Sequence, residues 1–224
     1  MHKLILLIAL LLFHPCAGYA AETARAPRTL MQIAGVQLPT AKFSDSVLLV
    51  IDAQREYTDG KLPLAGIGAA VAETALLLKL ARQADAPVIH VIHKSKPGAM
   101  LFDPNGPFVD FIPQLAPAPG ETVIVKGLPN AFAATNLDRH LAVLGRKNLI
   151  VAGFATHMCV SATVRAALDH GYRTTLVASA TATRDLPDGM GGSVPAAVLQ
   201  QAGIAALNDR FATIVAGAAN IPLR

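Results

Sequence analysis

The feature that most constrains the fold is a repeated alternation of short apolar runs with stretches of helical spacing. An apolar run over residues 47–51 is followed by apolar residues at helical spacing over 71–84, and Pro87 then introduces a second run over 88–92. Runs this continuous are typical of strands buried on both faces. Strands that alternate with helices predict a parallel sheet covered by helices on both sides and joined by right-handed crossovers.

The same alternation continues through residue 215. Further strands are predicted over 123–125, 149–152, 175–178 and 213–215, and further helices over 136–144, 160–170 and 194–208. We therefore expect an α/β protein with a mainly parallel sheet of about six strands. Ligands of such sheets bind beyond the carboxyl ends of the strands, so residues that directly follow a strand are the first candidates for a site.

The beginning of the chain has the pattern of a secretory signal. Lys3 supplies a basic start, residues 4–13 are an unbroken apolar run, and small residues precede Ala21. The run is too short to span a bilayer, and no later segment is apolar over the roughly 20 residues that a membrane helix needs. We expect residues 1–20 to be a signal peptide of an exported protein, periplasmic or secreted, that has no membrane association after cleavage.

The rest of the chain is expected to form one domain. Residues 21–43 show no sustained period and are expected to be a leader segment on a domain that spans residues 44–218. The composition, 53% hydrophobic and 15% charged, fits a compact globule. The net charge of +4 comes from scattered Lys and Arg without a basic run that interleaves with aromatics, so a nucleic-acid partner is not expected.

One cysteine stands out. Cys16 lies in the predicted signal, so Cys159 is the only cysteine of the expected mature chain, which excludes an intramolecular disulfide. Cys159 lies where a helical pattern begins, and a helix N-terminus can stabilise a thiolate. An ordinary buried cysteine is the alternative.

Asp52, Lys126 and Cys159 each follow a predicted strand, so they can converge at one edge of the sheet. A carboxylate beside a thiol can accept its proton, and an ammonium beside both would stabilise the thiolate and keep the carboxylate ionised. Each residue alone also has an ordinary explanation: a cap, a solvated charge or a core side chain. The combination favours nucleophilic catalysis.

Three segments carry a resemblance to a known family. They are Val50-Ile51-Asp52-Ala53-Gln54, the pair Val125-Lys126 with Asn130-Ala131-Phe132 after it, and a run from Gly153 of the form G-x-x-T-x-x-C-V-x-x-T-x-R-x-A followed by Gly171-Tyr172. The chain resembles the isochorismatase-like cysteine hydrolases, relatives of the nicotinamidases, from about residue 46 to 215. The resemblance implies a three-layer Rossmann-like fold, a small-molecule substrate and a homo-oligomer.

The resemblance also implies roles. Cys159 would be the nucleophile, Asp52 the general base and Lys126 the residue that orients and supports both. The backbone N–H groups of Ala155 and Cys159 would form the oxyanion hole, with a cis peptide between Phe154 and Ala155. The implied reaction is attack on a carbonyl carbon, a thioester intermediate with release of an amine or ammonia, and hydrolysis by water.

The metal ligands of the nicotinamidases are missing from the pattern. Those relatives carry a His-x-His pair, whereas His90 and His93 are three apart and would point to opposite faces of a strand. We expect His90 to lie in the core, and we expect neither a metal nor a cofactor. Relatives that cleave the vinyl ether of isochorismate lack the cysteine, so Cys159 favours an amide substrate.

The candidates for the substrate pocket are Gln54, Tyr57, His93, Phe132 and His157, with a further wall from residues 98–111. Tyr57 and Phe132 are equally compatible with plain core, and His157 with solvent. Two alternatives to an amidase stay open: a hydrolase of another small molecule, such as an isochorismate-like vinyl ether, and a catalytically silent binding protein of the same fold. The intact Asp52, Lys126 and Cys159 set argues against silence.

Overall fold

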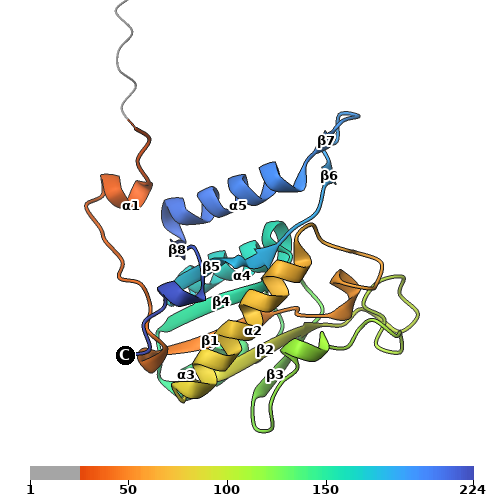
Figure 1. The fold of residues 1–224 in the computed structure, drawn as a ribbon, viewed down its shortest axis with the longest axis horizontal. Coiled ribbons are helices and arrows are strands. Elements are labelled where there is room, and N and C mark those ends of the chain that lie inside the picture. Colours follow the sequence, from red (N-terminus) through yellow and green to blue (C-terminus); the bar gives the residue numbers. More distant parts are fainter. Residues whose placement is uncertain (1–25) are drawn as a thin grey trace, which may run out of the picture.

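The computed structural model describes residues 26–224, and its main element is a six-stranded parallel sheet (Figure 1). Its strands are β1 (Ser46–Ile51), β2 (Val88–His93), β3 (Thr122–Lys126), β4 (Asn148–Phe154), β5 (Arg173–Ala182) and β8 (Ala212–Val215). Their order across the sheet is β3-β2-β1-β4-β5-β8, with every pair parallel. The predicted fold class is confirmed.

The strand order places a crevice at the centre of the sheet. From β1 the chain moves outward through β2 to β3, and it then returns to the other side of β1 with β4. The connections that leave β1 and β4 therefore diverge, and ligands of open parallel sheets bind beyond the carboxyl ends of such strands. Asp52 follows β1 at this point, and the turn that carries Cys159 follows β4.

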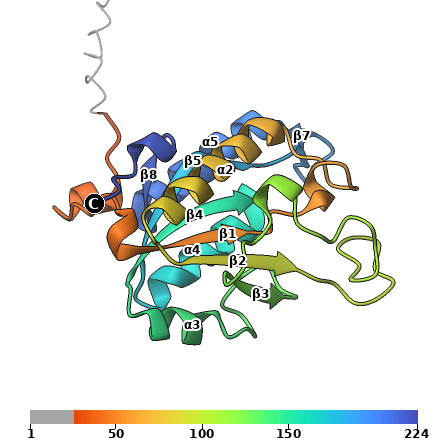
Figure 2. The same ribbon diagram turned by 60° about the horizontal axis from the view of Figure 1, so that its bottom comes forward.

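Helices cover both faces of the sheet. Figure 2 shows α2 (Ile67–Gln83) on one side, with α3 (Leu137–Leu144) and α4 (Ser161–Asp169) on the other. The remaining long helix, α5 (Ala196–Arg210), packs against α4 and β8. All six residues of β1 are buried, as expected for a strand covered on both faces.

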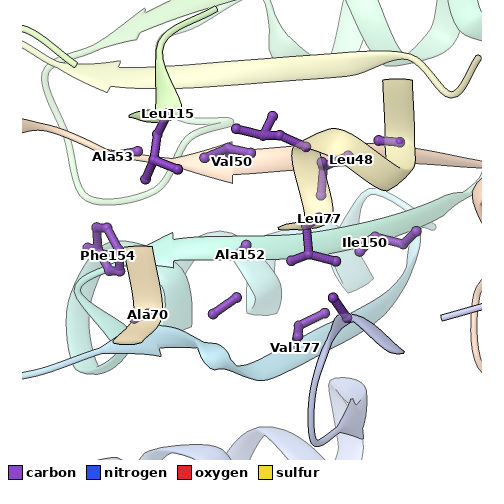
Figure 3. Close-up of a cluster of buried hydrophobic side chains, with 14 of the residues drawn as sticks. Leu48, Val50, Ala53, Ala70, Leu77, Leu115, Ile150, Ala152, Phe154 and Val177 are labelled. Carbon is purple, nitrogen blue, oxygen red and sulfur yellow. The ribbon is translucent and has the colours of Figure 1, made fainter. Parts of the chain in front are cut away.

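The side-chain period of β1 divides the core in two. Leu48 and Val50 belong to the cluster on the α2 side, and Leu49 belongs to the cluster on the α3 and α4 side. Figure 3 shows Leu77 of α2 among side chains from β1, β4 and β5, such as Ile150. Full burial of a leucine contributes about 1.5 to 3 kcal/mol, so this layer holds the central strands, and with them the crevice, in place.

Several short elements have no counterpart in the predicted pattern. They are α1 (Leu30–Ile33), the hairpin of β6 (Leu186–Pro187) and β7 (Ser193–Val194), the 3-10 turns Phe43–Asp45, Arg55–Tyr57, Pro113–Leu115 and Ala218–Asn220, and a π-helical turn at Thr156–Val160. The hairpin projects from the body just before α5 (Figure 1).

The segment before β1 lies against the domain. Helix α1 contacts α5, and the Leu30 N–H donates to Asp209 Oδ1 at 2.7 Å. The predicted signal peptide lies outside the described residues. Among residues 26–224, no helix combines the length and the apolar character that a membrane crossing requires.

Candidate active site

Asp52, Lys126 and Cys159 meet beyond the carboxyl edge of the sheet. The Lys126 Nζ atom lies 2.7 Å from Asp52 Oδ2 and donates to Cys159 Sγ at 3.3 Å. All three residues are buried, with exposures of 0, 1 and 4% in the same order. The structure therefore brings together three chemically matched side chains from three strands that are far apart in the sequence.

The sheet geometry explains why the cation is a lysine. Lys126 ends the edge strand β3, and β2 lies between β3 and β1. Neighbouring strands are about 4.8 Å apart, so a side chain from β3 must cross roughly 10 Å to reach a group that follows β1. The long lysine side chain covers most of that distance, and the Asp52 carboxylate meets its Nζ atom at 2.7 Å. Directly after β1, Asp52 has a left-handed backbone with φ of 49°, which turns the chain at the end of the strand.

The turn that carries Cys159 departs from the expected helix start. Residues Thr156–Val160 form one π-helical turn, and α4 begins only at Ser161. The N–H groups of Met158 and Val160 both donate to Ala155 O, at 3.1 and 3.2 Å. Cys159 thus lies where the helical segment begins, in a π-helical first turn that runs directly into α4. The peptide between Phe154 and Ala155 is cis, as the resemblance implied.

The surroundings of Cys159 favour the protonated thiol over the thiolate. Burial, and next the charge of Asp52, raise the pKa of Cys159 to about 12, against the opposing effect of Lys126. Burial also raises the pKa of the Asp52 carboxyl, while the adjacent Lys126 ammonium lowers it. Desolvation and the neighbouring carboxylate thus outweigh the ammonium in their effect on the pKa of the Cys159 thiol. The geometry instead pairs a thiol with a carboxylate that can take its proton.

His93 contacts the lysine. Its Nδ1 atom lies 3.1 Å from Lys126 Nζ, and the two residues are register partners in the β2–β3 pair. Burial, and then the Lys126 charge, lower the pKa of His93 to about 4, so the ring is neutral near pH 7. A neutral ring can accept at Nδ1 from the ammonium. The structure thus adds His93 to the buried charge pair.

Gln54 holds the end of β2. Its Oε1 atom accepts from the His93 N–H at 2.8 Å, and its Nε2 atom donates to His93 O at 2.9 Å and to Val109 O at 2.7 Å. The side chain is fully buried. Both amide protons are therefore committed to backbone oxygens, so the structure places Gln54 beneath His93 as a support.

An aromatic wall borders the charge pair. The Phe102 ring lies edge-on to Tyr57 at 5.4 Å and to His93 at 4.9 Å between ring centroids. Phe102 has a left-handed φ of 54°, and its N–H donates to Glu56 Oε2 at 3.1 Å. Burial, followed by the charge of Asp52, raises the pKa of Tyr57 well above its ordinary value, so the tyrosine lies in the field of the site.

The two remaining pocket candidates lie in different surroundings. Phe132 stacks on His170 and Tyr172, with centroid distances of 4.5 and 5.9 Å, which is a packing contact at the far end of α4. His157 is half-buried, and its Nδ1 atom hydrogen-bonds Thr183 Oγ1 just after β5.

His90 is fully buried, and its Nε2 atom lies 2.8 Å from Glu121 Oε2, which confirms its assignment to the core. No group of three His, Cys, Asp or Glu residues that could hold a metal ion occurs within residues 26–224.

Comparison with known proteins identifies the family. A profile described as the isochorismatase domain matches residues 46–219 of this chain. The chain belongs to the isochorismatase family. A solved isochorismatase structure from Pseudomonas putida KT2440 superposes with a TM-score of 0.83 at 47% identity, covering 87% of this chain and 99% of that chain.

Two curated relatives in the isochorismatase family bear on activity and location. A secreted isochorismatase effector of Verticillium dahliae is 38% identical over 181 residues, which cover 81% of this chain and 93% of the relative. A maleamate amidohydrolase of Pseudomonas putida is 33% identical over 146 residues, which cover 58% of this chain and 68% of the relative. The chain is thus an isochorismatase-family hydrolase with amidohydrolases among its relatives.

Proposed function

We propose that this protein is an exported, metal-independent cysteine hydrolase that cleaves the C–N bond of a small amide through a thioester. The observation that carries the proposal is the contact of Lys126 Nζ with both Asp52 and Cys159, at 2.7 and 3.3 Å. A thiol, a proton acceptor and a fixed cation are the groups that nucleophilic acyl transfer requires. The likeness to a maleamate amidohydrolase supports an amide as the substrate.

The first half-reaction forms the thioester. Asp52 takes the thiol proton as Cys159 Sγ attacks the carbonyl carbon, and the N–H groups of Ala155 and Cys159 stabilise the oxyanion. When the tetrahedral intermediate collapses, the C–N bond breaks and the proton on Asp52 passes to the leaving nitrogen. Ammonia or an amine departs, and the acyl group stays on Sγ.

The second half-reaction returns the enzyme to its starting state. Asp52 takes a proton from water as the water oxygen attacks the thioester carbon. The C–S bond then breaks, the carboxylic acid leaves, and the sulfur regains the proton from Asp52. The Lys126 ammonium contacts both Asp52 and Cys159, so it stabilises the anionic species that form at these two residues.

The decisive experiment is ammonia release from a panel of small primary amides by the purified mature protein, beside the Cys159→Ala variant. Ammonia from the wild type alone, together with an acyl adduct on Cys159 detected by mass spectrometry, is the expected result. Turnover that persists in Cys159→Ala would eliminate the thioester mechanism. A folded wild type that releases no ammonia from any amide would speak against the amidase proposal.

Three further parts of the proposal have separate tests. A chelator should leave turnover unchanged, whereas a loss of turnover that added zinc restores would contradict metal independence.

The likeness to a secreted effector supports export. Sequencing of the mature N-terminus from culture fractions would test export, with cleavage expected near Ala21. Light scattering of the purified protein would test the proposed homo-oligomer.

A further inference from the structure

A long loop carries part of the aromatic wall. Residues 94–112 join the end of β2 to the turn Pro113–Leu115 without a helix or strand of their own, and loops of this kind are usually functional. Phe102 lies in this loop and is buried, and its ring lies edge-on to that of His93, with 4.9 Å between the centroids. His93 in turn contacts Lys126, so the wall adjoins the buried charge pair.

A buried carboxylate links this loop to the segment that follows β1. Glu56 is 3% exposed, and its Oε2 atom accepts from the Phe102 N–H at 3.1 Å. Its Oε1 atom accepts from the Lys61 N–H at 2.8 Å. None of the ion pairs within residues 26–224 includes Glu56. Burial of a carboxylate is costly unless hydrogen bonds satisfy it, so both oxygens are committed to holding backbone in place.

The conformation of Phe102 depends on its backbone hydrogen bonds. The Phe102 carbonyl accepts from the Ser95 N–H at 2.9 Å, and the φ of 54° is uncommon for a residue other than glycine. A hollow of about 210 Å³ is lined by Glu56 and by loop residues on both sides of Phe102 in the sequence, among them Met100 and Asp103. The loop is therefore not closely packed here, and the bond that Glu56 accepts helps to hold the ring of Phe102 against His93.

We propose that Glu56 is a positioning residue that fixes the Phe102 ring at the edge of the substrate pocket, so that the enzyme selects amides by the width of their acyl group. A wider acyl group must displace the ring, and displacement breaks the bond from the Phe102 N–H to Glu56. A carboxylate suits this role because its two oxygens accept from two N–H groups at once, whereas an amide offers one acceptor oxygen. The inference rests on the proposed amidase function and adds a determinant of substrate choice.

The test compares primary amides in pairs whose second member has the wider acyl group: acetamide with isobutyramide, and benzamide with cyclohexanecarboxamide. We expect the wild type to prefer the narrower member of at least one pair by roughly 10-fold or more in kcat/KM for ammonia release. Glu56→Met fills a similar space without the two oxygen acceptors and should bring this ratio near one. The change should come mainly from a lower KM for the wider amide. Glu56→Gln keeps one acceptor and should keep part of the preference.

A matched control releases another bond to the same loop. Lys61 Nζ donates to Met100 O at 3.0 Å on the surface, and Lys61→Met removes this bond while the Lys61 N–H remains for Glu56. Lys61→Met should therefore keep the preference for the narrower amide. An unchanged ratio in Glu56→Met would overturn the proposal, as would an equal loss of preference in Lys61→Met, which would assign the effect to loop stability in general.

Phe102→Leu tests the same wall without removing the carboxylate. This variant keeps the backbone N–H that Glu56 accepts from and replaces the ring by a smaller side chain. It should lose the preference even if Glu56→Met fails to fold. A folded Phe102→Leu protein that selects as the wild type does would show that the ring does not limit the acyl group, and the proposal would fail.

Direct binding separates failure of this inference from failure of the amidase proposal. Calorimetry on Cys159→Ala protein measures the affinity for each amide without turnover. Tighter binding of a narrower amide, lost in the Cys159→Ala, Glu56→Met double variant, would support the role of Glu56 even if the wild type releases no ammonia. If no narrower amide binds more tightly than its wider partner, the inference is wrong.

Discussion

At the scale of single residues, the site depends on how two buried charges affect one thiol. Asp52 and Lys126 form an ion pair at 2.7 Å with essentially no exposure, and Cys159 lies against both. Removal of one member of a buried pair leaves the other uncompensated, which typically costs about 3 to 5 kcal/mol. Variants must therefore be judged on chemistry and folding together.

Asp52→Asn separates proton acceptance from thiolate formation. The Asp52 charge raises the pKa of Cys159, so its removal should lower that pKa and speed alkylation by iodoacetamide at pH 7. Turnover should nevertheless fall by roughly 10²- to 10⁴-fold, because the general base is lost. Alkylation that slows together with turnover would mean that Asp52 maintains a thiolate, contrary to the proposed mechanism.

The wild type provides the reference for that experiment. With the pKa of Cys159 at about 12, the rate of alkylation should still be rising at pH 10, whereas an ordinary thiol levels off above about 8.5. A plateau near pH 9 would show that the thiol is less perturbed than its burial implies. Thermal unfolding of both proteins, measured in parallel, shows whether the variant remains folded.

We expect His93 to act as a positioning residue. Its effect on turnover should depend on the hydrogen-bond acceptor that it offers Lys126 and not on the shape of its ring. Its neutral Nδ1 atom faces Lys126 Nζ at 3.1 Å, and the shorter amide side chain of a His93→Asn variant would offer an oxygen in a similar place. We expect His93→Leu to lower kcat about 10-fold more than His93→Asn does, with similar KM values, since a hydrogen bond to a charged group contributes about 1.5 to 3 kcal/mol. Equal kcat values in the two variants would assign His93 to packing alone.

At the scale of elements, the sequence predicts the strands and helices that long apolar patterns mark. All six strands of the sheet and its four long helices lie where periodicity places them, because burial on a regular face leaves a pattern over many residues. The π-helical turn at Thr156–Val160 and the two-residue strands of the hairpin leave no such pattern. They are too short for a period, and tertiary contacts determine their shape.

At Gly153 the backbone of β4 leaves no room for a side chain beside β1. It pairs with Ile51 across β1 and β4, has φ of 120°, and a Cβ atom there would lie 2.0 Å from Ile51 O. Gly153→Ala should destabilise the fold by about 3 kcal/mol, through overpacking and backbone strain, and lower Tm by roughly 6 to 12 °C.

A glycine without that contact serves as the control. Gly145 also has a positive φ, of 66°, but nothing lies within 4 Å of its Cβ position. Gly145→Ala should therefore cost only about 1 kcal/mol, from the left-handed backbone. Calorimetric scans compare the two, and equal losses of Tm would show that strain alone, not the approach of β1, determines the requirement at Gly153.

At the scale of the whole molecule, topology explains why part of the site was predictable. Asp52 and Cys159 follow strands that meet at the centre of the sheet, and Lys126 reaches them from the edge. The rule that strand ends converge selects these three residues together with His93, and the chemical match of carboxylate, ammonium and thiol then singles out the three. It does not predict that the Gln54 side chain would bond backbone groups, since side-chain direction in a loop depends on packing that leaves no period.

Acid stability of the whole molecule follows from its partly buried histidines. Burial lowers the pKa of His90, His93 and His157. Just below about pH 6.5 these three rings therefore take up protons more readily in the unfolded chain than in the folded protein. The unfolded state then binds more protons, and stability falls as the pH drops. Asp52 acts in the opposite direction, because its raised pKa favours proton uptake by the folded state, but it is one group against three.

Tm measured from pH 8 to pH 4 should therefore fall once the pH passes below about 6.5. Glu121 extends the decline, because the stability from its pKa of about 2 is present above its ordinary 4.5 and is lost as the pH falls from there toward 2. His90→Leu places an apolar side chain at the fully buried position and removes a group that takes up a proton in the unfolded chain. That variant should show a shallower fall between pH 6.5 and 4, and an unchanged slope would mean that His90 takes up its proton without unfolding.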